Sequence, residues 1–163
     1  MSLLLIDLDN TLREPLSGQQ YFQHPQDQQI IAGADIALRA YKDDWIIVGI
    51  TNQGGVGAGH KSMQQCVQEQ QYTLELFPEL REIYFCPDFE GRKCFRVTHH
   101  NVHNHSKTKW SGTYRKPGAG MLNLAMVRHK YSPQNTLYVG DRPEDEAAFL
   151  GTALILKIGR SLQ

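Results

Sequence analysis

Two aspartates separated by one residue, Asp7 and Asp9, stand directly behind the apolar run 3–6, and a second pair, Asp141 and Asp145, follows the apolar run at 136–139. Carboxylates can act as nucleophiles, as general acids and bases, and as ligands for hard cations. A bare charge is costly to bury, so an apolar segment that leads into acids needs a balancing positive group. The spacing therefore favours a polar site at the ends of buried strands.

Five short apolar runs, rich in branched and aromatic residues, do not alternate with polar ones, as is typical of strands buried on both faces. They span residues 3–6, 45–51, 83–86, 136–140 and 153–158. Between them, apolar residues recur at helical spacing: Ile31, Ala34, Leu38 and Tyr41; Met63, Cys66, Val67 and Leu74; Met121, Leu124 and Ala125. This alternation predicts an α/β fold, a Rossmann-like parallel sheet with helices on both faces.

Ligands bind at the carboxyl ends of the strands in such sheets, and polar residues of this chain follow several strands. The first acidic pair ends one strand, where residues two apart point the same way. Thr51 and Asn52 end the next, ahead of the glycine-rich turn "QGGVGAG". Lys116 precedes Pro117, a residue suited to start a helix. We therefore expect acids, a hydroxyl and a lysine to meet at one rim.

The segments "DLDNT", "TNQ", "RKP" and "GDRPED" occur in this order along the chain. As an ordered set they resemble the four motifs of the haloacid dehalogenase (HAD) superfamily of phosphohydrolases, over about Leu3 to Leu156. One branch of the superfamily is most similar in sequence at three segments, "DLDNTL", "ITNQGG" and "RKPGAGM". A short cysteine-bearing loop precedes the last of them. That branch holds the histidinol-phosphate and heptose-bisphosphate phosphatases and the 3′-phosphatase half of polynucleotide kinase/phosphatase.

The resemblance implies a phosphoric monoester hydrolase that works through an aspartyl-phosphate. Asp7 matches the nucleophile, and Asp9 matches the group that protonates the leaving oxygen and then activates water. Thr51, helped by the backbone of Asn52, would hydrogen-bond a phosphoryl oxygen. Lys116 would neutralise the charge that builds during transfer and orient the nucleophile, as phosphoryl transfer requires.

Magnesium is the cofactor that the resemblance implies, since it prefers oxygen ligands. Asp7, the backbone carbonyl of Asp9, and Asp141 would hold the ion. Asp145 would support the metal-bound waters or the catalytic lysine from behind. Arg142 has two interpretations, a contact to a substrate phosphate or an ordinary surface residue.

The chain has little room for a cap over this site. Only 41 residues separate Asp9 from Thr51, too few for the folded cap domain that encloses small substrates in many superfamily members. The later insertion, Pro87 to Tyr114, is also short. A length of 163 residues predicts a single domain over 1–163, without a large cap domain and with an open site.

A basic loop rich in cysteine and histidine, at about 86–115, is the main charge asymmetry. From Arg92 to Lys116 there are seven Lys or Arg, four of the seven His and no acid, while the rest of the chain has ten basic and seventeen acidic residues. The loop would suit a small bisphosphate or a polynucleotide, whose bases stack on aromatic side chains. Our first expectation is a small sugar or amino-alcohol (bis)phosphate, our second a nucleic acid 3′-phosphate. The third is a non-catalytic phosphate- or nucleic-acid-binding module on the same fold.

The same loop offers soft ligands for a structural zinc ion: Cys86, Cys94, His99 and His103. In the similar heptose-bisphosphate phosphatases the corresponding loop binds zinc through a Cys-x-His and a Cys-x-Cys pair. Here Asp88 replaces that histidine, and no cysteine stands two residues after Cys94. The alternatives are therefore a rearranged zinc site and a His-rich surface loop with two unpaired thiols.

Three further observations bear on partners and location. Three cysteines are an odd number, which fits a reducing cytoplasm. No apolar run is long enough to cross a bilayer, and no basic residues precede the run at 3–6, so we expect a cytoplasmic protein that is a monomer and has no membrane partner. The segment "GGVGAGHKS" is close to a nucleotide-binding loop, but its lysine is displaced by one position, so a turn at the rim is expected.

Overall fold

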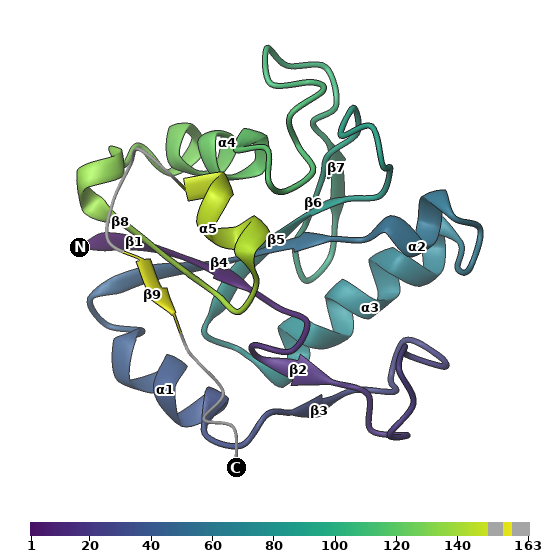
Figure 1. Ribbon diagram of the computed structural model, residues 1–163. Helices are drawn as coiled ribbons and strands as arrows, with labels where there is room; N and C mark the ends of the chain where they lie inside the picture. Colours follow the sequence, from purple (N-terminus) through teal and green to yellow (C-terminus); the bar gives the residue numbers. More distant parts are fainter. Residues whose placement is uncertain (150–154, 158–163) are drawn as a thin grey trace.

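The computed structural model describes residues 1–149 and 155–157, and its main feature is a seven-stranded sheet in the order β7-β6-β5-β4-β1-β8-β9 (Figure 1). The parallel strands are β1 (Ser2–Asp7), β4 (Trp45–Asn52), β5 (Leu80–Cys86), β8 (Thr136–Gly140) and β9 (Ile155–Lys157). They match the five predicted apolar runs. Residues 153, 154 and 158 of the last run lie outside the described residues.

Helices cover both faces of the sheet (Figure 1). On one face lie α4 (Gly120–His129) and α5 (Pro143–Phe149), and on the other α1 (Ala34–Tyr41) and α3 (Met63–Leu76). Because side chains alternate along a strand, Leu3 and Leu5 of β1 join the first core, and Leu4 and Ile6 join the second. The predicted α/β architecture is therefore confirmed.

One edge of the sheet differs from the all-parallel arrangement that we predicted. β6 (Phe95–Val97) runs antiparallel to β5, and β7 (Val102–Asn104) runs antiparallel to β6. Strands of three residues are too short to show a period in the sequence. The sheet is therefore mixed, and the basic loop is partly a β-hairpin.

The segment between the first acidic pair and β4 holds only small elements besides α1. These are β2 (Arg13–Glu14) and β3 (Gln29–Ile30), which form a two-stranded antiparallel sheet. After β4 comes the four-residue helix α2 (Gly54–Gly57), and a 3₁₀ turn (Pro133–Asn135) precedes β8. The described part of the chain thus contains no cap domain. Nor does that part contain a helix with the length and apolar character needed to span a membrane.

The helix expected to start at Pro117 starts instead at Gly120. The Lys116–Pro117 peptide bond is cis, and the following residues close a tight turn in which Gly118 N donates to Arg115 O over 2.7 Å. The chain therefore has to complete this turn before α4 can begin. Lys116 thus enters the site from a turn that precedes the helix.

Candidate active site

Lys116 is the buried centre of the site. Its Nζ donates to Asp7 Oδ1 at 2.9 Å, to Asp145 Oδ1 at 2.6 Å and to Tyr138 Oη at 3.0 Å. Burial alone would lower the pKa of Lys116, but the two carboxylates raise it well above its ordinary value. The side chain is therefore a fixed ammonium between two acids.

The two acids respond differently to sharing one ammonium. Burial raises the pKa of Asp7 to about 7; the charge of Asp145 adds to the rise, and Lys116 opposes it. Burial also acts to raise the pKa of Asp145, but Lys116 and the Tyr138 hydroxyl hold that pKa below its ordinary value. A second positive charge near Asp7 would thus favour its ionised form.

Three carboxylates could supply that second charge by holding a cation. One oxygen from each of Asp7, Asp141 and Asp145 lies within 4.8 Å of the others, and no other such group of acidic, His or Cys side chains occurs among the described residues. A donor set made only of oxygen suits a hard cation such as Mg²⁺. The structure therefore brings together the acids that the sequence assigned to one rim, with Asp145 bonded to Lys116 as well.

Glycine makes the close approach of Asp145 feasible. A Cβ on Gly140, the last residue of β8, would stand 2.4 Å from the Cβ of Asp145. Any side chain there would force the Asp145 carboxyl away from Lys116. The contact between Asp145 and Lys116 therefore depends on a glycine at the end of β8.

Asp9 lies off the strand that we expected to hold it. β1 ends at Asp7, and the chain then turns: Asn10 has φ 63°, and Thr11 N and Arg13 N both donate to Leu8 O. Asn10 and Thr11 were expected to make this turn, but Asp9 was expected one pleat further along the same strand face. The left-handed residue bends the chain before another pleat can form.

The Asp9 carboxylate contacts Arg13, Thr51 and Gln53. Arg13 Nε lies 3.0 Å from Asp9 Oδ1, while Thr51 Oγ1 and Gln53 Nε2 donate to Oδ2 over 3.3 and 3.1 Å. Burial acts to raise the pKa of Asp9, but the Arg13 guanidinium holds it below its ordinary value. Thr51 is thus beside Asp9 at the end of β4.

Asn52 connects β4 to the lysine-bearing turn. Its Nδ2 donates to Lys116 O at 3.0 Å, and Lys116 N donates to Asn52 Oδ1 at 2.9 Å. The side chain therefore fixes the backbone of Lys116, and both of its polar atoms are used in doing so. Arg142 is exposed and contacts Asp145 through its backbone N–H at 3.1 Å.

Sequence reasoning assigned no role to Arg13, Gln53 or Tyr138. Gln53 belongs to the quoted "TNQ" segment, and its spacing from Thr51 was the one available signal. A Tyr inside a buried strand and an Arg shortly after one look like ordinary core and surface residues. Only the fold shows that their polar atoms reach the site.

Arg115 forms a second cationic feature on the rim. Its guanidinium carbon lies 4.9 Å from the ring centre of Phe89, which is 57% exposed. Both side chains stand beside Gly54, the first residue of α2. Arg115 NH1 is buried, and no described residue accepts a hydrogen bond from it. The guanidinium therefore has bonding capacity for an anion.

The four expected zinc ligands do not meet in this structure. The antiparallel register sets Cys86 beside Cys94 at one end of the β5–β6 ladder, while His99 lies beyond its other end. His103, on β7, pairs with Arg96 of β6. The hairpin register thus carries the imidazoles away from the thiols, and within residues 1–149 and 155–157 no group of three such ligands forms there.

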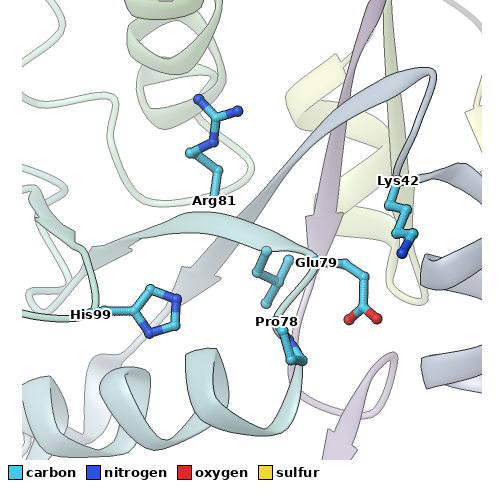
Figure 2. A pocket seen from close by; sticks show the side chains of 6 residues that line it. Lys42, Pro78, Glu79, Arg81 and His99 are labelled. Atoms are coloured by element: carbon cyan, nitrogen blue, oxygen red, sulfur yellow. The ribbon is translucent and has the colours of Figure 1, made fainter.

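A pocket of about 440 Å³ lies at the opposite, amino end of β5 (Figure 2). It is lined by Lys42, Pro78, Glu79, Leu80, Arg81 and His99. In Figure 2, Arg81 and Lys42 point in different directions and neither turns toward His99. Its charged groups do not converge, so the rim around Lys116 is the candidate active site.

Comparison with known proteins shows the family of the chain. The family model described as polynucleotide kinase 3 phosphatase matches residues 2–148. A D-glycero-beta-D-manno-heptose-1,7-bisphosphate 7-phosphatase of Haemophilus influenzae is 28% identical over 160 residues, which cover 95% of this chain and 79% of that protein. A D-glycero-D-manno-heptose-1,7-bisphosphate 7-phosphatase of Thermosynechococcus vestitus is 26% identical over 148 residues, 87% of this chain and 70% of the relative.

Solved structures share the fold. The D,D-heptose 1.7-bisphosphate phosphatase from B. bronchiseptica, complexed with magnesium and phosphate, has a TM-score of 0.67 and 20% identity, and the match covers 91% of this chain and 74% of that one. A HAD-like phosphatase from Mesorhizobium loti has the same TM-score of 0.67 at 22% identity, with 91% and 67% covered. The four ordered motifs, the fold and these relatives make the chain a HAD phosphatase, and it belongs to the polynucleotide kinase 3 phosphatase family.

Proposed function

We propose that this enzyme hydrolyses a small sugar bisphosphate in a magnesium-dependent reaction, through an aspartyl-phosphate on Asp7. The observation that carries the proposal is the buried ammonium of Lys116, 2.9 Å from Asp7 Oδ1, at the edge of an all-oxygen cluster. A nucleophilic carboxylate needs such a cation beside it, because negative charge accumulates on the phosphoryl group during transfer.

Two steps account for the residues of the site. In the first, a carboxylate oxygen of Asp7 attacks phosphorus and the bond from phosphorus to the ester oxygen breaks. Asp9, whose protonated form the negative charge of the bound phosphate favours, gives its proton to that oxygen. In the second, Asp9 takes a proton from water, the water oxygen attacks phosphorus, and the Asp7–phosphorus bond breaks to release inorganic phosphate. Thr51 Oγ1 and the Asn52 backbone would bind the non-reacting phosphoryl oxygens.

Magnesium fits the donors that the chain offers. Asp7, Asp141 and the backbone carbonyl of Asp9 would hold the ion, with Asp145 behind them, because all of these donors are oxygens. Bound there, the ion would neutralise charge on the phosphoryl group. Arg142, exposed just before α5, is proposed as a weaker phosphate contact.

Arg115 supports a substrate with a second anionic group. Its buried NH1 has spare hydrogen-bonding capacity within the described structure, and its guanidinium carbon lies 4.9 Å from the ring centre of Phe89. A planar guanidinium suits a phosphate that remains bound while another reacts. The heptose-1,7-bisphosphate phosphatases among the relatives act on a substrate of this kind.

Phosphate release tests the proposal directly. The panel would contain a heptose 1,7-bisphosphate, a sugar monophosphate, histidinol phosphate and a 3′-phosphorylated oligonucleotide, each with Mg²⁺ and with a chelator. We expect kcat/KM to be highest for the bisphosphate, by about tenfold, and to vanish with the chelator. Asp7→Asn should abolish turnover, whereas Asp43→Asn, an exposed control, should retain it. Full turnover by Asp7→Asn would refute the mechanism.

A polynucleotide 3′-phosphate is the second candidate, favoured by the exposed cations of the hairpin region. Arg92, Lys93, Lys107 and Lys109 are exposed, and Lys109 Nζ lies 5.1 Å from the ring centre of Trp110. Salt separates the two candidates, because each phosphate contact to a polynucleotide makes binding more salt-dependent. Efficient turnover of the oligonucleotide that falls steeply with salt would favour this candidate over the sugar bisphosphate.

A non-catalytic binding module is disfavoured by the acids at the site. A carboxylate beside a phosphate repels it when ionised, so a module that only binds a phosphate has no need for two acids at its site. The phosphatase relatives over 95% of the chain point the same way.

A further inference from the structure

The protein holds both oxygens of the Asp9 carboxylate, although 40% of this side chain is exposed. Oδ1 receives Arg13 Nε at 3.0 Å, and Oδ2 receives Gln53 Nε2 at 3.1 Å. A carboxylate bonded on both oxygens cannot turn freely about its last torsion, which is otherwise broad. The steps proposed above give neither Arg13 nor Gln53 a task, so their contacts need an explanation.

Arg13 is a fully buried anchor between the first turn and α3. Its NH1 donates to Gln70 Oε1 at 2.8 Å and to Thr73 Oγ1 at 2.5 Å, and the ring centre of Phe22 lies 5.1 Å from its guanidinium carbon. A buried cation is costly unless it is paired. The carboxylate that pairs with it is that of Asp9. Arg13 therefore stabilises one position of Asp9 strongly.

Gln53 is fixed from its far side by Lys61. Lys61 Nζ donates to Gln53 Oε1 at 2.5 Å and to Glu69 Oε2 at 2.6 Å, and the Glu69 side chain is only 4% exposed. Because an ammonium can only donate, the oxygen of the Gln53 amide must face Lys61. Its NH₂ group therefore faces Asp9 Oδ2 and Thr51 Oγ1, the latter at 2.9 Å.

From these contacts we infer that Arg13 and Lys61 are positioning residues that hold the Asp9 carboxylate in one orientation for proton transfer to the leaving oxygen. Arg13 acts directly on Oδ1, and Lys61 acts through Gln53 on Oδ2. The inference rests on the proposed function, in which Asp9 protonates that oxygen. Lys61 is the lysine of "GGVGAGHKS", so this segment contributes an anchor for the acid.

The nature of the leaving group separates positioning from general stability. The oxygen of an alkyl phosphate needs a proton as it leaves, whereas p-nitrophenol leaves readily as an anion. General acid catalysis contributes about 10²- to 10⁴-fold, so a loosened Asp9 should slow the alkyl ester far more. An equal loss on both esters is what a merely structural role would give.

The main variant combines Lys61→Met with Glu69→Gln, which removes both charges and leaves no buried acid unpaired. We expect kcat/KM, which reports the transfer to Asp7 and excludes the later hydrolysis common to both esters, to fall by about ten- to a hundredfold on an alkyl phosphate and by less than about threefold on p-nitrophenyl phosphate. Lys61→Arg keeps a donor for Gln53 and should recover most of the loss. Arg13→Lys should show the same substrate dependence as the main variant.

Two controls make the comparison specific. Arg96→Met with Glu82→Gln removes another buried ion pair, Arg96 NH1 to Glu82 Oε2 at 2.8 Å, from the other face of the sheet, and should change both esters equally. In an Asp9→Asn background the Lys61 and Glu69 changes should cause no further loss, because the acid that they position is gone. Melting temperatures would establish that every variant is folded.

The outcomes separate the two proposals. A wild-type enzyme that hydrolyses neither ester would overturn the proposed function and this inference with it. Normal hydrolysis by the wild type, with equal losses on the two esters or with a further loss in the Asp9→Asn background, would overturn the positioning role alone. Loss confined to the alkyl ester supports it.

Discussion

Low pH should weaken the ion pair that joins β6, in the basic loop, to the neighbouring strand β5. Glu82, on β5, is buried, and its carboxylate accepts hydrogen bonds from Arg96 NH1 at 2.8 Å, His129 Nε2 at 2.6 Å and Tyr84 Oη at 2.9 Å. Arg96 belongs to β6 and His129 to α4. Burial opposes the ionisation of Glu82, yet these three donors lower its pKa to about 2.

The size and sign of the effect follow from this pKa. The value for an unperturbed Glu is 4.5, so the folded chain favours the ionised form, and the stabilisation is fully present above about pH 4.5. It is lost as the pH falls through about 2. At about 1.4 kcal/mol for each pH unit, the difference corresponds to about 3 kcal/mol of unfolding free energy.

Urea unfolding of the wild type and of Glu82→Gln at two pH values would measure this contribution. The gap in unfolding free energy should be about 3 kcal/mol at pH 7 and should narrow by about 2 kcal/mol at pH 3. Glu75→Gln, an exposed change on α3, should give almost no gap at either pH. A Glu82→Gln gap of the same size at both pH values would refute the reasoning.

Three further changes address the site. Arg115→Met should raise KM for a sugar bisphosphate by about tenfold in steady-state kinetics and leave KM for a monophosphate unchanged, since only the second phosphate uses the guanidinium. Gly140→Ala should lower kcat and the melting temperature together, because its Cβ would stand 2.4 Å from that of Asp145. Tyr138→Phe should lower the unfolding free energy by about 1 kcal/mol in urea titrations, because the hydroxyl donates to Asp145 at 2.5 Å.

The parts of the site that the sequence predicted are those that strand ends determine. Asp7 and Thr51 end adjacent parallel strands, and Asp141 follows a third, so the rule that these ends share one edge was sufficient to bring them together. Lys116 was different. It reaches the site from a turn after the insertion 87–114; its position before Pro117 suggested a place at the rim, and its role came from the resemblance to a family motif.

The parts that the sequence missed depend on register and on distant partners. Arg13 is buried because Gln70 and Thr73, 57 and 60 residues away, accept its hydrogen bonds, and no local pattern encodes that distance. The spacing of Cys86 and His99 allowed a zinc site, but the antiparallel register of two short strands separates them. Hairpin register comes from pairing geometry, which composition does not reveal.

The surroundings of Asp7 make the folded chain less stable as the pH rises. Because its pKa is raised to about 7 from an ordinary 3.8, the folded state favours the protonated carboxyl, and stability falls as the pH rises between these values. Lys116 alone does not reverse this, since it is shared with Asp145. A divalent cation on Asp7 and Asp141 would favour the ionised nucleophile and so stabilise the fold and prepare the reaction at once. A buried acid without a full countercharge lowers the free energy of unfolding, and functional sites commonly carry this cost.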